Sequence, residues 1–101
     1  MIPPLPQIRL RSISRWMQDN RKTEFQKLTR SGALNSRVTE LDAQMIETFE
    51  TNEDQLKNSM MDNQTWGTEA GLTQFQTQRL EMWNQVVQDF LPVTSDQGQE
   101  D

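Results

Sequence analysis

The sequence predicts an all-α protein built around an antiparallel helical hairpin, with one arm at about 35–63 and the other at about 68–91. Apolar residues recur along both arms at steps of three, four or seven, which is the spacing of one helix face. A short polar segment that ends in Trp66-Gly67 separates the arms, and helices joined by so short a loop lie antiparallel. An additional amphipathic basic helix is expected at about 11–30, and packing it on the hairpin would give a three-helix bundle.

The first arm carries its apolar residues in two series whose members lie eleven residues apart. Eleven residues complete three turns at about 3.67 residues per turn, so the stripe runs nearly parallel to the helix axis. Asn35 or Ser36 is expected to cap the start of the helix with its side-chain oxygen. The polar segment 52–54 interrupts the stripe and predicts a water-facing kink or a thin spot in the packing. The apolar residues of this arm are Leu34, Val38, Leu41, Met45, Phe49, Leu56 and Met60.

The second arm repeats this pattern over a broad apolar face. Thr68 is the expected N-cap, and Glu69 then lies in the first turn, where the helix dipole favours a negative charge. Pro92 keeps the residue before it out of the α region, so the helix should end near Phe90. In the turn, Gly67 can adopt the positive φ that most residues avoid. The apolar residues of this arm are Leu72, Phe75, Leu80, Trp83, Val86, Val87 and Phe90.

Charge divides the chain into two unequal parts. Residues 1–37 hold eight Lys or Arg against two acidic residues, whereas residues 38–101 hold two against thirteen, which together give the net charge of −5. Such asymmetry predicts an anionic partner for the first part, within which residues 8–33 form a basic amphipathic segment. Nucleic acid, an anionic membrane surface or an acidic protein would each suit this segment. The candidate anion-binding residues are Arg9, Arg11, Arg15, Arg21 and Lys22.

The two ends of the chain differ from the rest in composition. Three prolines make residues 1–7 an extended, polyproline-like leader, although alternation in residues 7–11 also fits a short strand. A mitochondrial-type presequence over residues 1–30 is a further alternative, because the first acidic residue comes late in that range. Residues 92–101 form an acidic polar tail that has too few apolar residues to fold by itself.

The helix in the basic segment has two alternative ends. Gly32 suits the position just past a helix terminus, where a left-handed conformation is common. An earlier break is the alternative, because Asp19-Asn20 interrupts the apolar pattern. The segment that follows, Thr23-Glu24-Phe25-Gln26, then resembles a new capping box.

The sequence contains no motif for catalysis or metal binding, so we expect no enzymatic activity, no metal and no cofactor. It has no Cys, which excludes disulfides, zinc–thiolate sites and thiol nucleophiles, and no His, which is the commonest general base and metal ligand. The loop that begins at Asp62 fails as a calcium loop, because Trp66 and Thr73 occupy ligand positions. No apolar run reaches the roughly 18 residues of a membrane span, and no signal peptide is recognised.

The apolar content predicts that the fold needs a partner surface. Only 33% of the residues are hydrophobic, and a two-helix hairpin has a single buried seam. A small core of this kind rarely supplies more than about 3–5 kcal/mol, so an exposed apolar stripe should be covered by a second copy or by another protein. Large aromatic side chains are the favoured anchors of such interfaces. The candidate partner-binding residues are Trp16, Phe49, Trp66, Trp83 and Phe90.

A helical hairpin with Trp66 and Gly67 at its turn and Phe75 and Trp83 in its second arm, in a chain of 101 residues, resembles the Trp-x-Gly family of small secreted bacterial proteins. The resemblance covers about 55 residues. The resemblance implies a four-helix dimer that leaves the cell through a dedicated secretion machine. Two features depart from the family pattern. Glycine follows tryptophan directly here, and the chain has no tyrosine for a tyrosine-based export signal.

These observations favour a non-enzymatic helical structural, assembly or adaptor protein that packs into a larger multi-subunit particle. A phage virion component or a subunit of a bacterial complex would fit, with a cytoplasmic or virion-associated location. One alternative is a small nucleic-acid-binding regulator that uses residues 9–30, and another is the secreted hairpin dimer. Protein partners or a homo-oligomer are expected, and no small-molecule substrate is.

Overall fold

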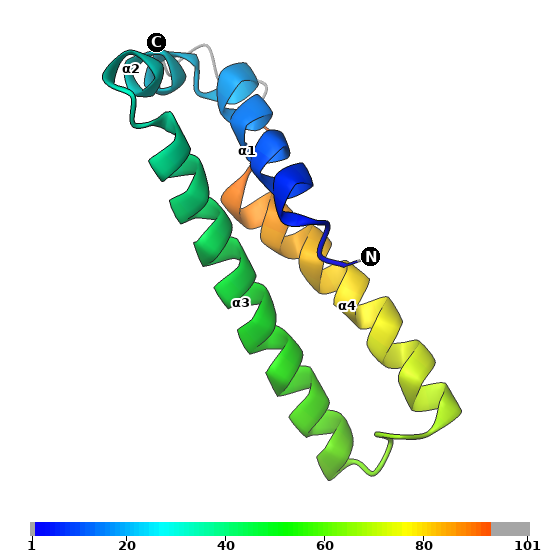
Figure 1. Ribbon diagram of the computed structural model, residues 1–101. Coiled ribbons are helices and arrows are strands. Elements are labelled where there is room, and N and C mark those ends of the chain that lie inside the picture. The colour runs from blue at the N-terminus through cyan, green and yellow to red at the C-terminus, as the bar shows by residue number, and fades with distance from the viewer. Residues whose placement is uncertain (1, 94–101) are drawn as a thin grey trace.

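The chain folds into four α-helices, and the computed structural model describes residues 2–93 (Figure 1). The helices are α1 (Pro6–Asn20), α2 (Lys22–Ser31), α3 (Leu34–Asp62) and α4 (Glu69–Phe90). Within the described range there is no strand, so the all-α prediction is confirmed. None of the described helices is long and apolar enough to cross a membrane. The predicted acidic tail lies almost wholly outside the described residues.

Helices α3 and α4 form the predicted antiparallel hairpin, and their ends follow the local chemistry of the chain. Thr68 caps α4, since its hydroxyl oxygen accepts a hydrogen bond from the Gly71 N–H at 2.9 Å. Gly67 takes a φ of 89°, and α4 ends at Phe90, two residues before the proline. The expected cap of the first arm is wrong. Helix α3 begins at Leu34, before both Asn35 and Ser36, and no side chain caps it.

The N-terminal third differs from the single predicted helix at about 11–30. Helix α1 begins at Pro6. Proline suits the first turn of a helix, because the backbone N–H that it lacks would have no partner there and because its ring fixes φ near the helical value. The chain then breaks at Arg21, whose backbone leaves the helical region with a φ of −137°, and α2 follows. No side chain caps α2, so the capping box at Thr23 is not formed. Gly32 closes α2 in the left-handed conformation, as predicted.

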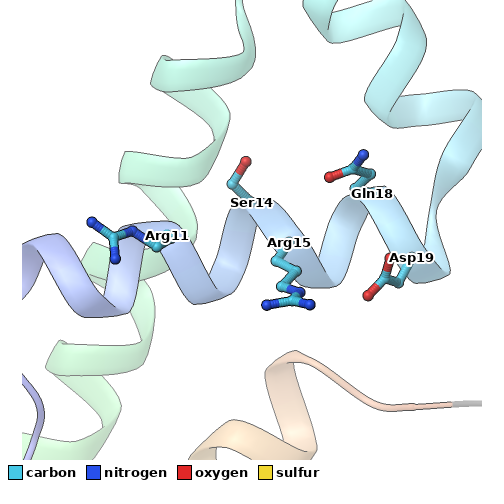
Figure 2. A pocket seen from close by; sticks show the side chains of 5 residues that line it. All are labelled: Arg11, Ser14, Arg15, Gln18 and Asp19. Carbon is cyan, nitrogen blue, oxygen red and sulfur yellow. The ribbon is translucent and has the colours of Figure 1, made fainter.

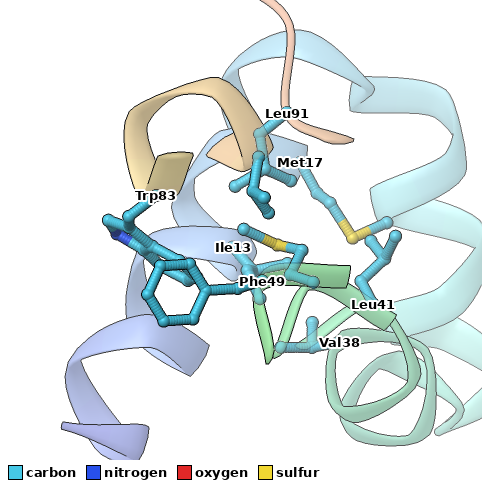
Figure 3. Packing of buried hydrophobic residues seen from close by; sticks show 9 residues of the cluster. Ile13, Met17, Val38, Leu41, Phe49, Trp83 and Leu91 are labelled. Carbon is cyan, nitrogen blue, oxygen red and sulfur yellow. The ribbon is translucent and has the colours of Figure 1, made fainter. Parts of the chain in front are cut away.

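The core lies at one end of the hairpin, where α1 packs against α3 and the last turns of α4 (Figures 1 and 3). Phe49 and Trp83 meet there edge to face, with ring centroids 5.7 Å apart. Helix α2 crosses the same end and packs on α3. The buried apolar residues of this cluster are Ile13, Met17, Val38, Leu41, Met45, Phe49, Trp83, Val86 and Leu91. Three helices therefore share one core at this end.

Beyond this core the hairpin continues as two helices, and we name residues 50–81 the distal arm. The N-terminal segment touches this arm at Arg79, which donates a hydrogen bond to the Ile2 carbonyl at 2.8 Å. The one buried large apolar side chain of the distal arm among the described residues is Met60, next to the turn. Between Met60 and the core, the Arg79 side chain forms an ion pair with Glu53 and lies 5.7 Å from the ring centroids of both Phe49 and Phe75. Helix α3 runs unbroken through residues 52–54. The polar interruption in the sequence therefore marks thin apolar packing filled by an ion pair.

Candidate interaction site at the hairpin tip

The turn between α3 and α4 is held by hydrogen bonds to its own backbone. The backbone N–H groups of Thr65 and Trp66 both donate to the Met60 carbonyl, at 2.9 and 3.2 Å. The Thr68 hydroxyl donates to the Thr65 carbonyl at 2.7 Å, in addition to capping α4. Gly71 allows the first turn of α4 to approach this carbonyl, because a Cβ on Gly71 would lie 2.0 Å from the Thr65 oxygen. The position of Trp66 is thus fixed by the turn.

Trp66 stands at the end of the distal arm, where Phe75 and Lys57 cover part of its ring and the rest is open to solvent. Its ring meets Phe75 edge to face at a centroid distance of 5.1 Å, and the Lys57 ammonium lies 5.2 Å from its centroid. Even so, Trp66 remains 39% exposed and Leu72 is 54% exposed. The two side chains border an open hollow of about 450 Å³, which we name the tip hollow; its lining residues are Trp66, Gly67, Thr68, Glu69 and Leu72.

The sequence did not indicate that Leu72 would be exposed. The apolar spacing predicts Leu72 on the buried face of the second arm, but in the first turn of α4 the buried residue is its neighbour Gly71. A glycine at the inward position brings the backbone close to the turn and directs Leu72 outward.

The structure separates the five predicted partner-binding aromatics. Phe49 is 1% exposed and Trp83 is also buried, so both contact the interior of their own chain and neither is available to a partner. Phe90 and Trp16 are partly buried against the same core. The Trp16 indole N–H donates to the Pro92 carbonyl at 3.0 Å, which ties α1 to the end of α4. Of the five residues, only Trp66 is exposed. It lies in the turn between α3 and α4, at the end of the hairpin away from the core.

Two of the predicted anion-binding residues are engaged within the chain. Arg9 forms a double hydrogen bond with the Asp42 carboxylate, at 2.6 and 3.1 Å, and donates to the Pro4 carbonyl at 2.6 Å. The hydrogen bond to Asp42 raises the pKa of the Arg9 guanidinium above its ordinary value. Arg21 stacks over the Trp16 ring at 5.0 Å and donates to the Asn20 carbonyl. These two arginines stabilise the fold and are not presented to a ligand.

The remaining three candidates are exposed on the outer surface of α1 and α2. Figure 2 shows Arg11 and Arg15 along one side of α1, bordering a shallow hollow of about 530 Å³ together with Ser14, Gln18 and Asp19. Lys22 borders a second hollow of about 280 Å³, which shares Gln18 with the first. The structure therefore places Arg11 and Arg15 at one hollow and Lys22 at an adjoining one, and their binding to an anion stays a prediction.

The interior offers little room for a small molecule. A hollow of about 150 Å³ lies between α1, α3 and α4, beside Ile13 and Trp83. Sites for small molecules usually measure about 300–1,000 Å³. In residues 2–93 no group of three or more Asp, Glu, His or Cys residues is placed to hold a metal ion.

Comparisons with known proteins identify no relative of this chain. No family model, no curated protein and no solved structure matches the chain. The resemblance of Trp66, Gly67, Phe75 and Trp83 to the Trp-x-Gly family therefore stays a prediction. The proposals below depend on the geometry of this chain alone.

Proposed function

We propose that this chain is a non-enzymatic subunit or adaptor of a larger protein assembly, and that it binds a protein partner through the tip hollow. The observation that carries the proposal is the exposure of Trp66 and Leu72 on a turn that is otherwise well ordered by hydrogen bonds. Hydrophobic side chains of this size are covered when a partner is bound, and a fixed turn loses little entropy on binding.

The lining of the tip hollow suits a protein partner. Trp66 supplies a large amphipathic surface, and tryptophan is among the residues that contribute most to binding energy at interfaces. Glu69, in the first turn of α4, and the ammonium of Lys57 provide polar groups around the apolar centre. An apolar centre with a polar rim is the usual composition of a protein–protein interface. The hollow is open and shallow, which fits a protein side chain better than an enclosed ligand.

The proposal is tested by the size of the native complex that contains this chain. In an extract of the cells that make it, we expect the chain to elute in size-exclusion chromatography far above its own 11.9 kDa. The double variant Trp66→Ser with Leu72→Ser should leave these fractions and elute at the size that the purified chain has without its partner, because it removes the apolar lining of the tip hollow.

The matched control for this experiment is Leu80→Ser with Val93→Ser. Both residues are exposed and apolar, and both lie outside the tip hollow. This variant should elute with the wild type. The proposal is overturned if the wild-type chain elutes as a free protein, or if the tip variant remains in the large complex.

A further inference from the structure

The basic residues of α1 and α2 fall into two groups. Arg9 and Arg21 are engaged with other groups of their own chain. A second group is exposed and forms no ion pair among the described residues, although the chain as a whole is acidic. The members of this second group are Arg11, Arg15, Lys22, Lys27 and Arg30. They form a basic surface, in which Asp19 is the acidic side chain that borders the same hollow as Arg11 and Arg15.

An acidic surface of matching length lies on the outer side of α3. Glu47, Glu50 and Asp54 are exposed at helical spacing and form no ion pair among residues 2–93. They differ in this from Asp42 and Glu53, which are paired within the chain. Residues three or four apart are neighbours on a helix surface, so these three carboxylates form one continuous row.

The two surfaces also match in their order along the helices. Ile8 and Arg15 lie seven residues apart on α1, and Asp54 and Met61 lie seven residues apart on α3, in the reverse order of chemistry. Seven helical residues span about 10.5 Å on each helix. If the helices lie antiparallel, the exposed Ile8 meets the exposed Met61 and Arg15 meets Asp54. Lys22 follows the break at Arg21, at the start of α2, and so lies beyond Arg15 at the end of α1 that is nearer Glu47 in this arrangement. Ile8 and Met61 are 48% and 52% exposed.

We propose that copies of this chain bind one another head to tail, with the outer row of α1 and Lys22 (Ile8, Arg15, Lys22) against the outer row of α3 (Glu47, Asp54, Met61) of the next copy. The proposal rests on the assembly function proposed above and adds a second, self-directed interface. Lys57, which lies between Asp54 and Met61 in sequence, directs its ammonium over the Trp66 ring and so away from the contact.

The two rows cannot meet within one molecule. Ile13 and Met17 bury the opposite side of α1, and Leu41 and Met45 bury the opposite side of α3, in the same core. Each row therefore faces away from that core, and the contact must join different surfaces of different copies. Such heterologous contacts form rings or open chains. Because the charges are exposed, salt should weaken the contact.

The experiment measures the mass of the purified full chain by light scattering and sedimentation velocity at low and high salt. We expect the wild type to contain two or more copies at low salt and to dissociate at high salt. The first variant, Arg15→Glu with Lys22→Glu, should be monomeric at low salt because both rows are then acidic. The second, Glu47→Lys with Asp54→Lys, should be monomeric because both rows are basic.

Mixing the two variants in equal amounts should restore association, because each row then meets a row of opposite charge. Controls with the same charge changes at other exposed sites are Lys27→Glu with Arg30→Glu, and Glu81→Lys with Asp89→Lys; both should associate as the wild type does. Circular dichroism checks that the variants fold. If a charge reversal unfolds the chain, Arg15→Gln with Lys22→Gln replaces it and should also weaken association.

Three outcomes would overturn the proposal: a monomeric wild type at low salt, variants that still associate alone, or a mixture that stays monomeric. A monomeric wild type that binds a short DNA duplex, with binding lost in Arg15→Glu with Lys22→Glu, would identify nucleic acid as the partner of the basic surface instead. The variant Trp66→Ser with Leu72→Ser should self-associate normally. If the tip variant loses the native complex and the wild type does not self-associate, the proposed function at the tip is supported and the head-to-tail contact is wrong.

Discussion

Gly71 shows how a single residue determines the shape of the hairpin tip. It is a poor helix former placed in the first turn of α4, where it is buried against the Thr65 carbonyl. That contact allows Thr68 to bond both to Thr65 and to the Gly71 N–H. With the glycine facing inward, the side chain of the next residue, Leu72, is directed into solvent. The exposed surface at the tip is therefore a consequence of one missing Cβ.

Replacing Gly71 with alanine should destabilise the protein, although alanine is the better helix former. The added Cβ would meet the Thr65 carbonyl at 2.0 Å and the Thr68 hydroxyl at 2.8 Å, so the backbone of the turn must shift. Overpacking of this kind costs about 1–3 kcal/mol, which exceeds the gain of up to about 1 kcal/mol in helix propensity. Urea unfolding followed by circular dichroism measures the change, and a higher free energy of unfolding would contradict the packing described for the turn.

At the scale of elements, helix α1 is attached to the hairpin by apolar and polar contacts together. Ile13 and Met17 enter the core, Trp16 bonds to the chain just after α4, and Arg9 pairs with Asp42 on α3. Both partners of this last pair are largely shielded from water. Hydrogen bonds to charged groups in such places contribute more than exposed ion pairs do.

Replacing Asp42 with asparagine should therefore loosen α1. The substitution keeps the size of the side chain but removes the charge that pairs with Arg9, and the loss in the free energy of unfolding should be about 1.5–3 kcal/mol. Glu47→Gln is the matched control, because Glu47 is exposed on the same helix and has no ion pair among the described residues. It should change stability by less than about 0.5 kcal/mol. If urea unfolding shows the same loss in the free energy of unfolding for both variants, the Arg9–Asp42 pair contributes no more to stability than an exposed carboxylate does.

The hairpin could be predicted from the sequence because each of its signals is local. The apolar spacing, the Thr68 cap and the proline after α4 each act within a few residues. The sequence indicates the break at Arg21 only as an alternative, at Asp19-Asn20, because the path of α2 across the end of the bundle depends on packing between helices. The same limit applies to the site. Arg9 and Arg11 lie two residues apart, and only the rotation of α1 against α3 directs one to Asp42 and the other to solvent.

At the scale of the whole molecule, packing is concentrated at one end of an elongated shape that measures 52 by 26 by 19 Å. The three-helix end holds the cluster of buried apolar residues, including Phe49 and Trp83. The distal arm has two helices, Met60 as its buried large apolar side chain, and the Glu53–Arg79 ion pair between Met60 and the core. The surface proposed to bind a partner is thus carried by the part of the protein with the thinnest core.

This asymmetry predicts that the distal arm opens before the rest of the protein unfolds. Segments with few buried apolar contacts open locally at lower free energy than the segments that form the core. In hydrogen–deuterium exchange followed by mass spectrometry, peptides from 52–62 and 72–80 should exchange sooner than peptides from 38–49 and 83–90. Glu53→Gln should accelerate exchange in the distal arm more than at the three-helix end, because Glu53 and Arg79 both belong to the distal arm and reach the core only where Arg79 contacts the Phe49 ring. Equal protection of the two ends would show that the hairpin behaves as one cooperative unit. A partner bound at the tip should then slow exchange first in the distal arm, since binding stabilises the closed form there.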